Sequence, residues 1–404
     1  MSRLRARVRN AVFRAVKRVP RREVSPDVKN DLFHAHESLF EFLGAFGSQR
    51  KVLVLGGEAY AAHAIAQGAA RVTAVLPSAA SRYGRRAFAA DNLEFRSDAT
   101  SATKYDVVIH NGVPRDIAAL RASLEPNGKL LVAITPAEDK KPLAGFANVR
   151  RFVHIANVAL DFSSPLFTDV PRSAFSFHEL GLHDLIPHHA IGIVYLATDD
   201  PKWRDLQLHL GCGPLALEGW INIDNQPYAG IDFRWDLARG IPFRNARYVF
   251  AEHFIEHLSY QQGVDFTRGC RAALHDDGIL RLSTPNLDWV WKVGYQPEAW
   301  ANEDEALRDC FVMNRAFRGW GHQFIYNLTT LTALLQNAGF ANVHTLTYGE
   351  SDTPALAGLE RHEKYIDSPD LPHVLVVEAS GRHEVTTIRG AANIAEYLRD
   401  VAAV

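Results

Sequence analysis

The sequence predicts an α/β protein with two tandem doubly wound, Rossmann-like domains behind a basic amphipathic helix at residues 1–24. Three observations lead to this prediction. Short apolar runs alternate with helical patterns, which is typical of parallel sheets covered by helices. The alternation starts twice, each time with an apolar run that ends in a glycine turn, at 51–57 and at 206–213. The chain has 404 residues, enough for two hydrophobic cores.

The first segment is strongly basic. Residues 1–22 contain nine Lys or Arg and no acid, so residues 23–404 carry a net charge of −11 although the whole chain is at −2. Apolar residues recur from Leu4 to Val19 at helical spacing, until Pro20 ends the pattern. Such a helix docks on this chain or on a partner, contacts anionic lipid, remains a solvated tail, or binds nucleic acid. A eukaryotic transit peptide is a further alternative.

The first domain is expected at residues 30–200, beginning with a helix at 30–46. Buried strands are predicted at 52–55, 72–76, 104–109 and 130–133, and closing antiparallel strands at 152–160 and 190–197. Its glycine turn, Gly56-Gly57-Glu58, is crowded by the glutamate, and the second strand ends in Val-Leu-Pro without an acid. Because a nucleotide site needs an open turn and a carboxylate at that tip, we predict a non-catalytic domain.

Four histidines lie within a dozen residues near the end of this domain: His178, His183, His188 and His189. This density is compatible with zinc, but no cysteine or regularly spaced carboxylate accompanies them, so we predict no metal site here. The three cysteines, Cys212, Cys270 and Cys310, lack C-x-x-C spacing and are expected to be reduced thiols. Residues 199–202 are expected to link the domains.

The second domain, at 203–381, opens with LQLHLGCGPLALEGWINID at 206–224. An apolar strand leads into Gly211-Cys212-Gly213, and the next strand ends at Asp224. Glycines let the backbone turn tightly against a ligand, and a carboxylate at the next strand tip can hold two ribose hydroxyls. About ten residues separate Gly213 from Asp224, too few for a full helix. The first crossover is therefore expected to be a turn.

Four blocks of this domain, LHLGCGP…GWINID, WDLARGIPF, YVFAEHFIEHL and LHDDGILRLSTPNLD, resemble the class I S-adenosylmethionine-dependent methyltransferase family. They are most similar to a bacterial type found beside polysaccharide-assembly enzymes. The resemblance implies S-adenosylmethionine (SAM) as cofactor and a degenerate copy of the same fold in the first domain. The cofactor-binding residues that it implies are His209, Gly211, Cys212, Gly213, Asp224, Asn225, Asp236, Leu237 and Glu252. His209 departs from the family pattern, in which an acid often stands before the glycine loop.

His253 follows the fourth strand of the second domain and is our candidate catalytic base. The run His253-x-x-Glu256-His257 also spells the inverted zinc-protease motif, but that motif needs a different fold and a distant third ligand. We interpret Glu256 and His257 as residues that pair or pack within the fold, although they lie close enough to His253 to orient it. No metal site is expected in this domain.

Residues 289–326 form an expected lid that is rich in aromatic residues. Aromatic faces mixed with polar groups suit a sugar ring, and His322 and Tyr326 are further catalytic candidates. Residues 382–404 are expected to be a helical tail. Together these features predict metal-independent O-methylation of a sugar or glycan hydroxyl by a cytoplasmic protein, with or without peripheral contact at the inner face of the membrane. A nucleic-acid methyltransferase and a non-enzymatic scaffold are the alternatives; the acidic body of the chain argues against nucleic acid.

Overall fold

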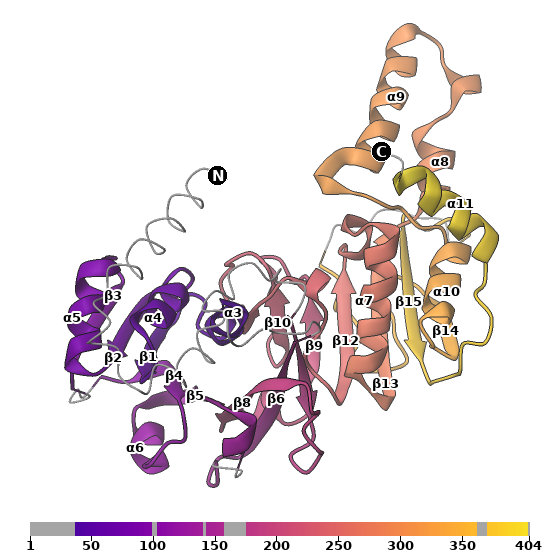
Figure 1. Ribbon diagram of the computed structural model, residues 1–404. Coiled ribbons are helices and arrows are strands. Elements are labelled where there is room, and N and C mark those ends of the chain that lie inside the picture. Colours follow the sequence, from indigo (N-terminus) through magenta and orange to yellow (C-terminus); the bar gives the residue numbers. More distant parts are fainter. Residues whose placement is uncertain (1–36, 99–102, 140–142, 157–174, 362–369, 403–404) are drawn as a thin grey trace. The chain divides into compact units, whose positions relative to one another are not determined.

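The computed structural model describes residues 37–98, 103–139, 143–156, 175–361 and 370–402. The basic helix predicted at 1–24 lies outside these residues. The chain divides into two compact units, Met1–Asp200 and Pro201–Val404. Each unit holds its own mostly parallel sheet, so the predicted two-domain α/β fold is confirmed (Figure 1).

The first unit contains an eight-stranded sheet in the order β3-β2-β1-β4-β5-β8-β6-β7. Its strands are β1 (Lys51–Leu55), β2 (Arg71–Val75), β3 (Leu93–Arg96), β4 (Tyr105–Asn111), β5 (Leu124–Ile134), β6 (Asn148–Ala156), β7 (Phe175–Leu180) and β8 (Ala190–Thr198). The first five strands run parallel, and the last three pair antiparallel. Two strands were not predicted: β3 is only half-buried, and β7 alternates at a sheet edge in the segment interpreted as a histidine-rich loop.

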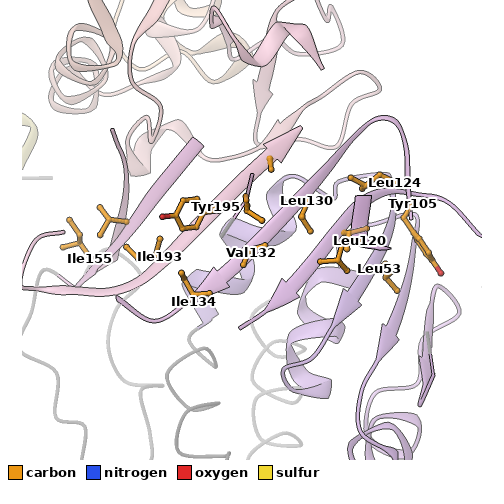
Figure 2. Close-up of a cluster of buried hydrophobic side chains, with 14 residues drawn as sticks. Leu53, Tyr105, Leu120, Leu124, Leu130, Val132, Ile134, Ile155, Ile193 and Tyr195 are labelled. Atoms are coloured by element: carbon orange, nitrogen blue, oxygen red, sulfur yellow. The ribbon is translucent and has the colours of Figure 1, made fainter. Parts of the chain in front are cut away.

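The described part of this unit has the helices α3 (Glu37–Ala45), α4 (Ala59–Ala66), α5 (Ser78–Ala87) and α6 (Ile117–Ala122). A short 3-10 turn, η1 (Pro136–Glu138), follows β5. A hydrophobic cluster on the sheet joins the parallel and antiparallel halves, with Val132 of β5 and Ile193 of β8 both almost fully buried (Figure 2). Continuous apolar strands of this kind are expected where both faces of a sheet are covered.

The second unit contains a seven-stranded sheet in the order β11-β10-β9-β12-β13-β15-β14. Its strands are β9 (Gln207–Leu210), β10 (Ile221–Asp224), β11 (Phe233–Arg234), β12 (Ala246–Glu252), β13 (Leu274–Pro285), β14 (Asn342–Leu346) and β15 (Val374–Ser380). The first five run parallel, and β15 pairs antiparallel with both β13 and β14. No helix separates β9 from β10, as the ten-residue spacing predicts.

The described helices of this unit follow β12, β13 and β15. They are α7 (Tyr260–Ala273), α8 (Leu287–Gly294), α9 (Glu303–Arg318), α10 (Leu328–Asn337) and α11 (Ala391–Ala402), with 3-10 turns η4 (Pro201–Trp203), η5 (Leu237–Arg239), η6 (Ile255–His257), η7 (Pro297–Ala299) and η8 (Gly319–Gly321). Asn327 caps α10 by accepting a hydrogen bond from the Thr330 N–H. The expected lid corresponds to α8, α9 and η8, which rise from the end of β13 (Figure 1).

Among the described residues, none of the helices combines the length and the apolar character that crossing a bilayer requires.

Candidate functional site

The turn after β9 contains two glycines, and their surroundings differ. Gly211 has φ +63°, and a Cβ there would lie 2.2 Å from the Phe254 ring, so only glycine allows this ring to pack. Gly213 has φ +53°, and a Cβ there would meet nothing within 4 Å. The turn is therefore tightly packed on its inner side at Gly211 and open at Gly213, where a ligand can approach the backbone.

Asp224 lies at the tip of β10, next to this turn. Its carboxylate accepts hydrogen bonds from the Gly213 N–H (2.9 Å) and from the Gln226 N–H (2.8 Å). Because β9 and β10 are adjacent parallel strands, their carboxyl ends meet at one edge of the sheet. Asn225 is exposed beside Asp224, and its side-chain oxygen accepts a hydrogen bond from Gln226.

The side chains of His209 and Cys212 are both buried. The His209 ring stacks on Phe250 and hydrogen-bonds Asn222 Oδ1 (3.1 Å), and burial lowers its pKa to about 4. Burial likewise raises the pKa of the Cys212 thiol to about 12, with Asp224 and Asp232 adding to the shift. Both side chains are therefore neutral, and their predicted roles in cofactor binding stay predictions.

Asp236 and Leu237 occupy the start of η5, just after β11. The Asp236 side chain is exposed and accepts the Ala238 N–H (3.0 Å), whereas Leu237 is buried. Trp235 donates its backbone N–H to the Asp224 carbonyl, which ties this segment to the tip of β10. Asp236 is thus exposed at the same edge of the sheet, and its predicted role in cofactor binding stays a prediction.

Glu252 ends β12 and is 7% exposed. Both of its carboxylate oxygens accept the backbone N–H of Arg361 at 3.0 Å. The Tyr348 hydroxyl also hydrogen-bonds Glu252, and burial together with this carboxylate raises the pKa of Tyr348 to about 12. Tyr348 was not predicted from the sequence. Arg361 belongs to a loop whose polar composition, from residue 350 onward, is a sequence signal that it joins the wall of the site.

His253 follows Glu252 in a left-handed conformation, with φ +46°. Its backbone N–H donates to the Ser283 carbonyl, and its ring Nδ1 lies 3.0 Å from Glu256 Oε1. A carboxylate only accepts, so Nδ1 carries the proton and Nε2 carries the lone pair of the neutral ring. An unusual backbone conformation in a non-glycine residue at a strand tip is typical of functional sites.

Glu256 is fully buried and connects several elements. Its carboxylate accepts from His253 through Oε1 and from the Thr284 hydroxyl through Oε2 (3.1 Å). Burial alone would raise its pKa, but the His253 hydrogen bond and the charges of His253 and His257 leave the pKa below its usual value. Glu256 pairs within the fold, as predicted, and its partner is the candidate base itself.

His257 and His322 lie side by side, with ring centroids 5.0 Å apart. His257 belongs to η6 and is half-buried, whereas His322 follows η8 and is buried. The His322 Nδ1 lies 2.7 Å from the Ala316 carbonyl oxygen, which must accept its proton. The structure therefore places the candidate His322 beside His257 and within reach of Glu256, because the ligand atoms of these three side chains all lie within 4.8 Å of one another.

Tyr326 differs from the other candidates because its side chain is fully buried. Its hydroxyl has no hydrogen-bond partner among the described residues and faces α7 at Gly263, where a Cβ would lie 2.7 Å away. Burial raises the pKa of this hydroxyl. The ring is packed as a core residue, and the predicted catalytic role of Tyr326 stays a prediction.

The insertion exposes large aromatic side chains. Trp291, Phe311 and Trp320 are 60%, 72% and 70% exposed. A cavity of about 250 Å³ at α8 is lined by Leu287, Asp288, Trp291 and Lys292. It begins two residues beyond the end of β13, the next parallel strand after β12.

In the first unit, the corresponding turn is crowded by a side chain. A Cβ at Gly57 would lie 2.6 Å from Asn111 Nδ2, and this amide donates to the Gly56 carbonyl (3.2 Å). The Asn111 side chain thus fills the region that is open at Gly213. The histidines of this unit also form no group of three close metal ligands in the described part of the chain.

No family model and no curated protein matches the chain. Among solved structures, the DhpI–SAH complex is 27% identical, with 21% of this chain and 48% of DhpI covered and a TM-score of 0.19. A SAM-dependent methyltransferase from Archaeoglobus fulgidus is 16% identical, with 43% and 85% covered and a TM-score of 0.28. Phosphoethanolamine N-methyltransferase 2 of Haemonchus contortus is 12% identical, with 82% and 86% covered and a TM-score of 0.27.

The sheets of the chain itself establish the fold. In both units the parallel strands follow the doubly wound order 3-2-1-4-5, and antiparallel strands complete the sheet. In the second unit the glycine turn, the strand-tip acid and the Glu252–His253 dipeptide end three adjacent parallel strands. By its sheets and by the order of its motifs, the chain has the class I SAM-dependent methyltransferase fold in two copies.

Proposed function

We propose that the second unit binds SAM and transfers its methyl group to a hydroxyl of a sugar or glycan-type acceptor. One observation carries this proposal. The open turn at Gly213, the carboxylate of Asp224 and the Glu252–His253 tip lie together at the carboxyl edge of β9, β10 and β12. Ligands of doubly wound sheets bind at this edge, where strand order reverses.

Methyl transfer from SAM requires mainly that the protein position the two reactants. SAM carries its methyl group on a sulfonium, and a hydroxyl oxygen displaces the sulfur in line while water is excluded. The hydroxyl proton must leave as the C–O bond forms, and His253 Nε2 is the acceptor that we assign. Glu256 holds the ring in the tautomer that leaves Nε2 basic. No metal is needed for this transfer step.

The acceptor class is inferred from the insertion. The cavity at α8 combines the indole of Trp291 with the carboxylate of Asp288 and the ammonium of Lys292. An aromatic face stacks on the C–H face of a sugar, and charged groups hydrogen-bond its hydroxyls. The first unit, with Asn111 over its glycine turn, acts as a scaffold without cofactor.

The test is calorimetric titration of S-adenosylhomocysteine (SAH) into the full-length protein and into Asp224→Ala. We expect about one equivalent to bind, and the variant to lose this binding. Asp265→Ala, which removes an exposed carboxylate on α7, is the matched control and should bind like the wild type. Two equivalents would contradict the scaffold role of the first unit, and no binding would leave the whole chain a scaffold. Once binding is established, methyl transfer to sugars against RNA decides the acceptor class.

A further inference from the structure

A second group of polar side chains includes Glu256, the hydrogen-bond partner of the candidate base His253. Glu256, His257 and His322 each offer a ligand atom, and these atoms all lie within 4.8 Å of one another. It is the one such group of three in the described part of the chain. Sequence spacing does not reveal it, because His322 lies more than sixty residues beyond His257. The insertion brings the two segments together.

The backbone around the group is fixed by its own hydrogen bonds. The N–H groups of Gln323 and Phe324 both donate to the Glu256 carbonyl, at 2.7 Å and 3.2 Å. The Gln323 side chain donates to the His257 carbonyl at 2.6 Å. The segment that carries His322 is therefore held against η6 whether or not the three side chains share a ligand.

The side chains themselves are oriented as metal ligands usually are. His322 donates its Nδ1 proton to the Ala316 carbonyl, so its Nε2 carries a lone pair. Glu256 accepts from His253 and Thr284, which fix the plane of its carboxylate. A backbone carbonyl behind a histidine and donors behind a carboxylate are the outer contacts that orient ligands in metal sites.

We propose that Glu256, His257 and His322 bind one divalent transition-metal ion, for which Zn²⁺ is the best match. Two imidazoles and one carboxylate are a known zinc ligand set, with water in the fourth position. Tetrahedral binding at about 2.0–2.1 Å would bring the three ligand atoms to about 3.4 Å from one another, a contraction that side-chain rotation can supply. Glu256 and His322 are buried, and the half-buried His257 leaves a way in.

The ion would hold protein segments in place and would take no part in the transfer of the methyl group. It would join η6, which follows the tip of β12, to the segment where the insertion returns to the sheet. Glu256 would then touch the ion and His253 at once, so that metal binding and the orientation of His253 are linked. This site is separate from the proposed cofactor site, and its test does not require methyl transfer.

The experiment uses full-length protein stripped with a chelator and titrated with Zn²⁺ alone, by calorimetry against a competing chelator. Co²⁺ provides a second readout, because ligation by this set gives visible absorption that free Co²⁺ lacks at comparable strength. His257→Ala is the main variant, since a half-buried side chain can be removed without a core cavity. His275→Ala is the control, because His275 is exposed and also lies beside a carboxylate, Asp277.

We expect one equivalent of Zn²⁺ in the wild type and in His275→Ala. In His257→Ala the affinity should fall by at least about 100-fold, beyond the 10–100-fold cost of losing an outer contact, and the Co²⁺ spectrum should be lost. His322→Ala should behave the same way. Absence of binding in the wild type, or equal binding in His257→Ala, would overturn the proposal. Loss of binding in His275→Ala would place the metal at the surface instead.

Discussion

The imidazole of the half-buried His253 and the carboxylate of the fully buried Glu256 form a dyad, with Nδ1 and Oε1 3.0 Å apart. Replacing Glu256 with Gln exchanges one acceptor oxygen for an amide donor. We expect methyl transfer to fall by about 10–100-fold while SAH affinity is unchanged, because orientation of the base is lost. Turnover and SAH calorimetry on the same preparation measure the two effects. If Glu256→Gln turned over as fast as the wild type, Glu256 would have no role in the mechanism.

The tautomer of His253 gives a check that needs no acceptor substrate. With Glu256 present, the Nδ1–H tautomer of the neutral ring should dominate, and ¹⁵N chemical shifts of the ring should report a protonated Nδ1. In Glu256→Gln the two ring nitrogens should become more alike. A wild-type ring protonated on Nε2 would contradict the assignment of Nε2 as the base.

The two glycines of the turn form a matched pair. Gly211→Ala places a Cβ 2.2 Å from the Phe254 ring in a left-handed conformation, so we expect a loss of about 2–4 kcal/mol of stability in the second unit. Gly213→Ala meets no neighbour and should cost only about 1 kcal/mol, but SAH affinity should fall at least tenfold. Hydrogen exchange measured on individual peptides reports the stability of the second unit separately from that of the first. The reverse order of stabilities would contradict the packing described here.

His209 should make the stability of the second unit sensitive to acid. Its pKa is lowered to about 4 in the fold, against 6.5 when exposed. Between these values the unfolded chain binds a proton and the folded one does not, so stability is full above pH 6.5 and falls as the pH drops towards 4, by up to about 3 kcal/mol. His209→Gln, which keeps a donor for Asn222, should lose less stability over this range. Chemical denaturation at pH 7 and at pH 4.5 measures the free energy of unfolding of the wild type and of His209→Gln.

Arg281 illustrates the cost of leaving buried charges unpaired. It is fully buried and donates to Glu360 (2.7 Å) and Glu378 (2.8 Å). Arg281→Met should destabilise the second unit by about 3–5 kcal/mol, because two carboxylates lose their partner. Arg308→Met is the control: Arg308 is 64% exposed, and its pair with Asp309 should contribute less than about 1 kcal/mol. Similar losses in both variants would contradict this difference in burial.

The sequence predicts what is local and periodic. Apolar runs predict the central strands of both sheets, and the turn at Gly211–Gly213 with Asp224 marks the edge of the sheet where we propose that the cofactor binds. Strands β3 and β7 were missed because a half-buried or edge strand lacks a continuous apolar run. Contacts between distant segments were also missed. Arg361 reaches Glu252 across more than one hundred residues, and no periodicity encodes that approach.

The turn that replaces a helix between β9 and β10 also affects the order of folding. The face of the sheet near Phe250 is covered by Leu217 and Trp220 of this connection together with Leu356 and Leu359 from much further along the chain. Closing such a long loop is slow, and a nascent chain cannot complete this cover until residue 359 has left the ribosome. We therefore expect β9, β10 and β12 to form early as an open platform, and the cofactor edge to mature among the last parts of the protein.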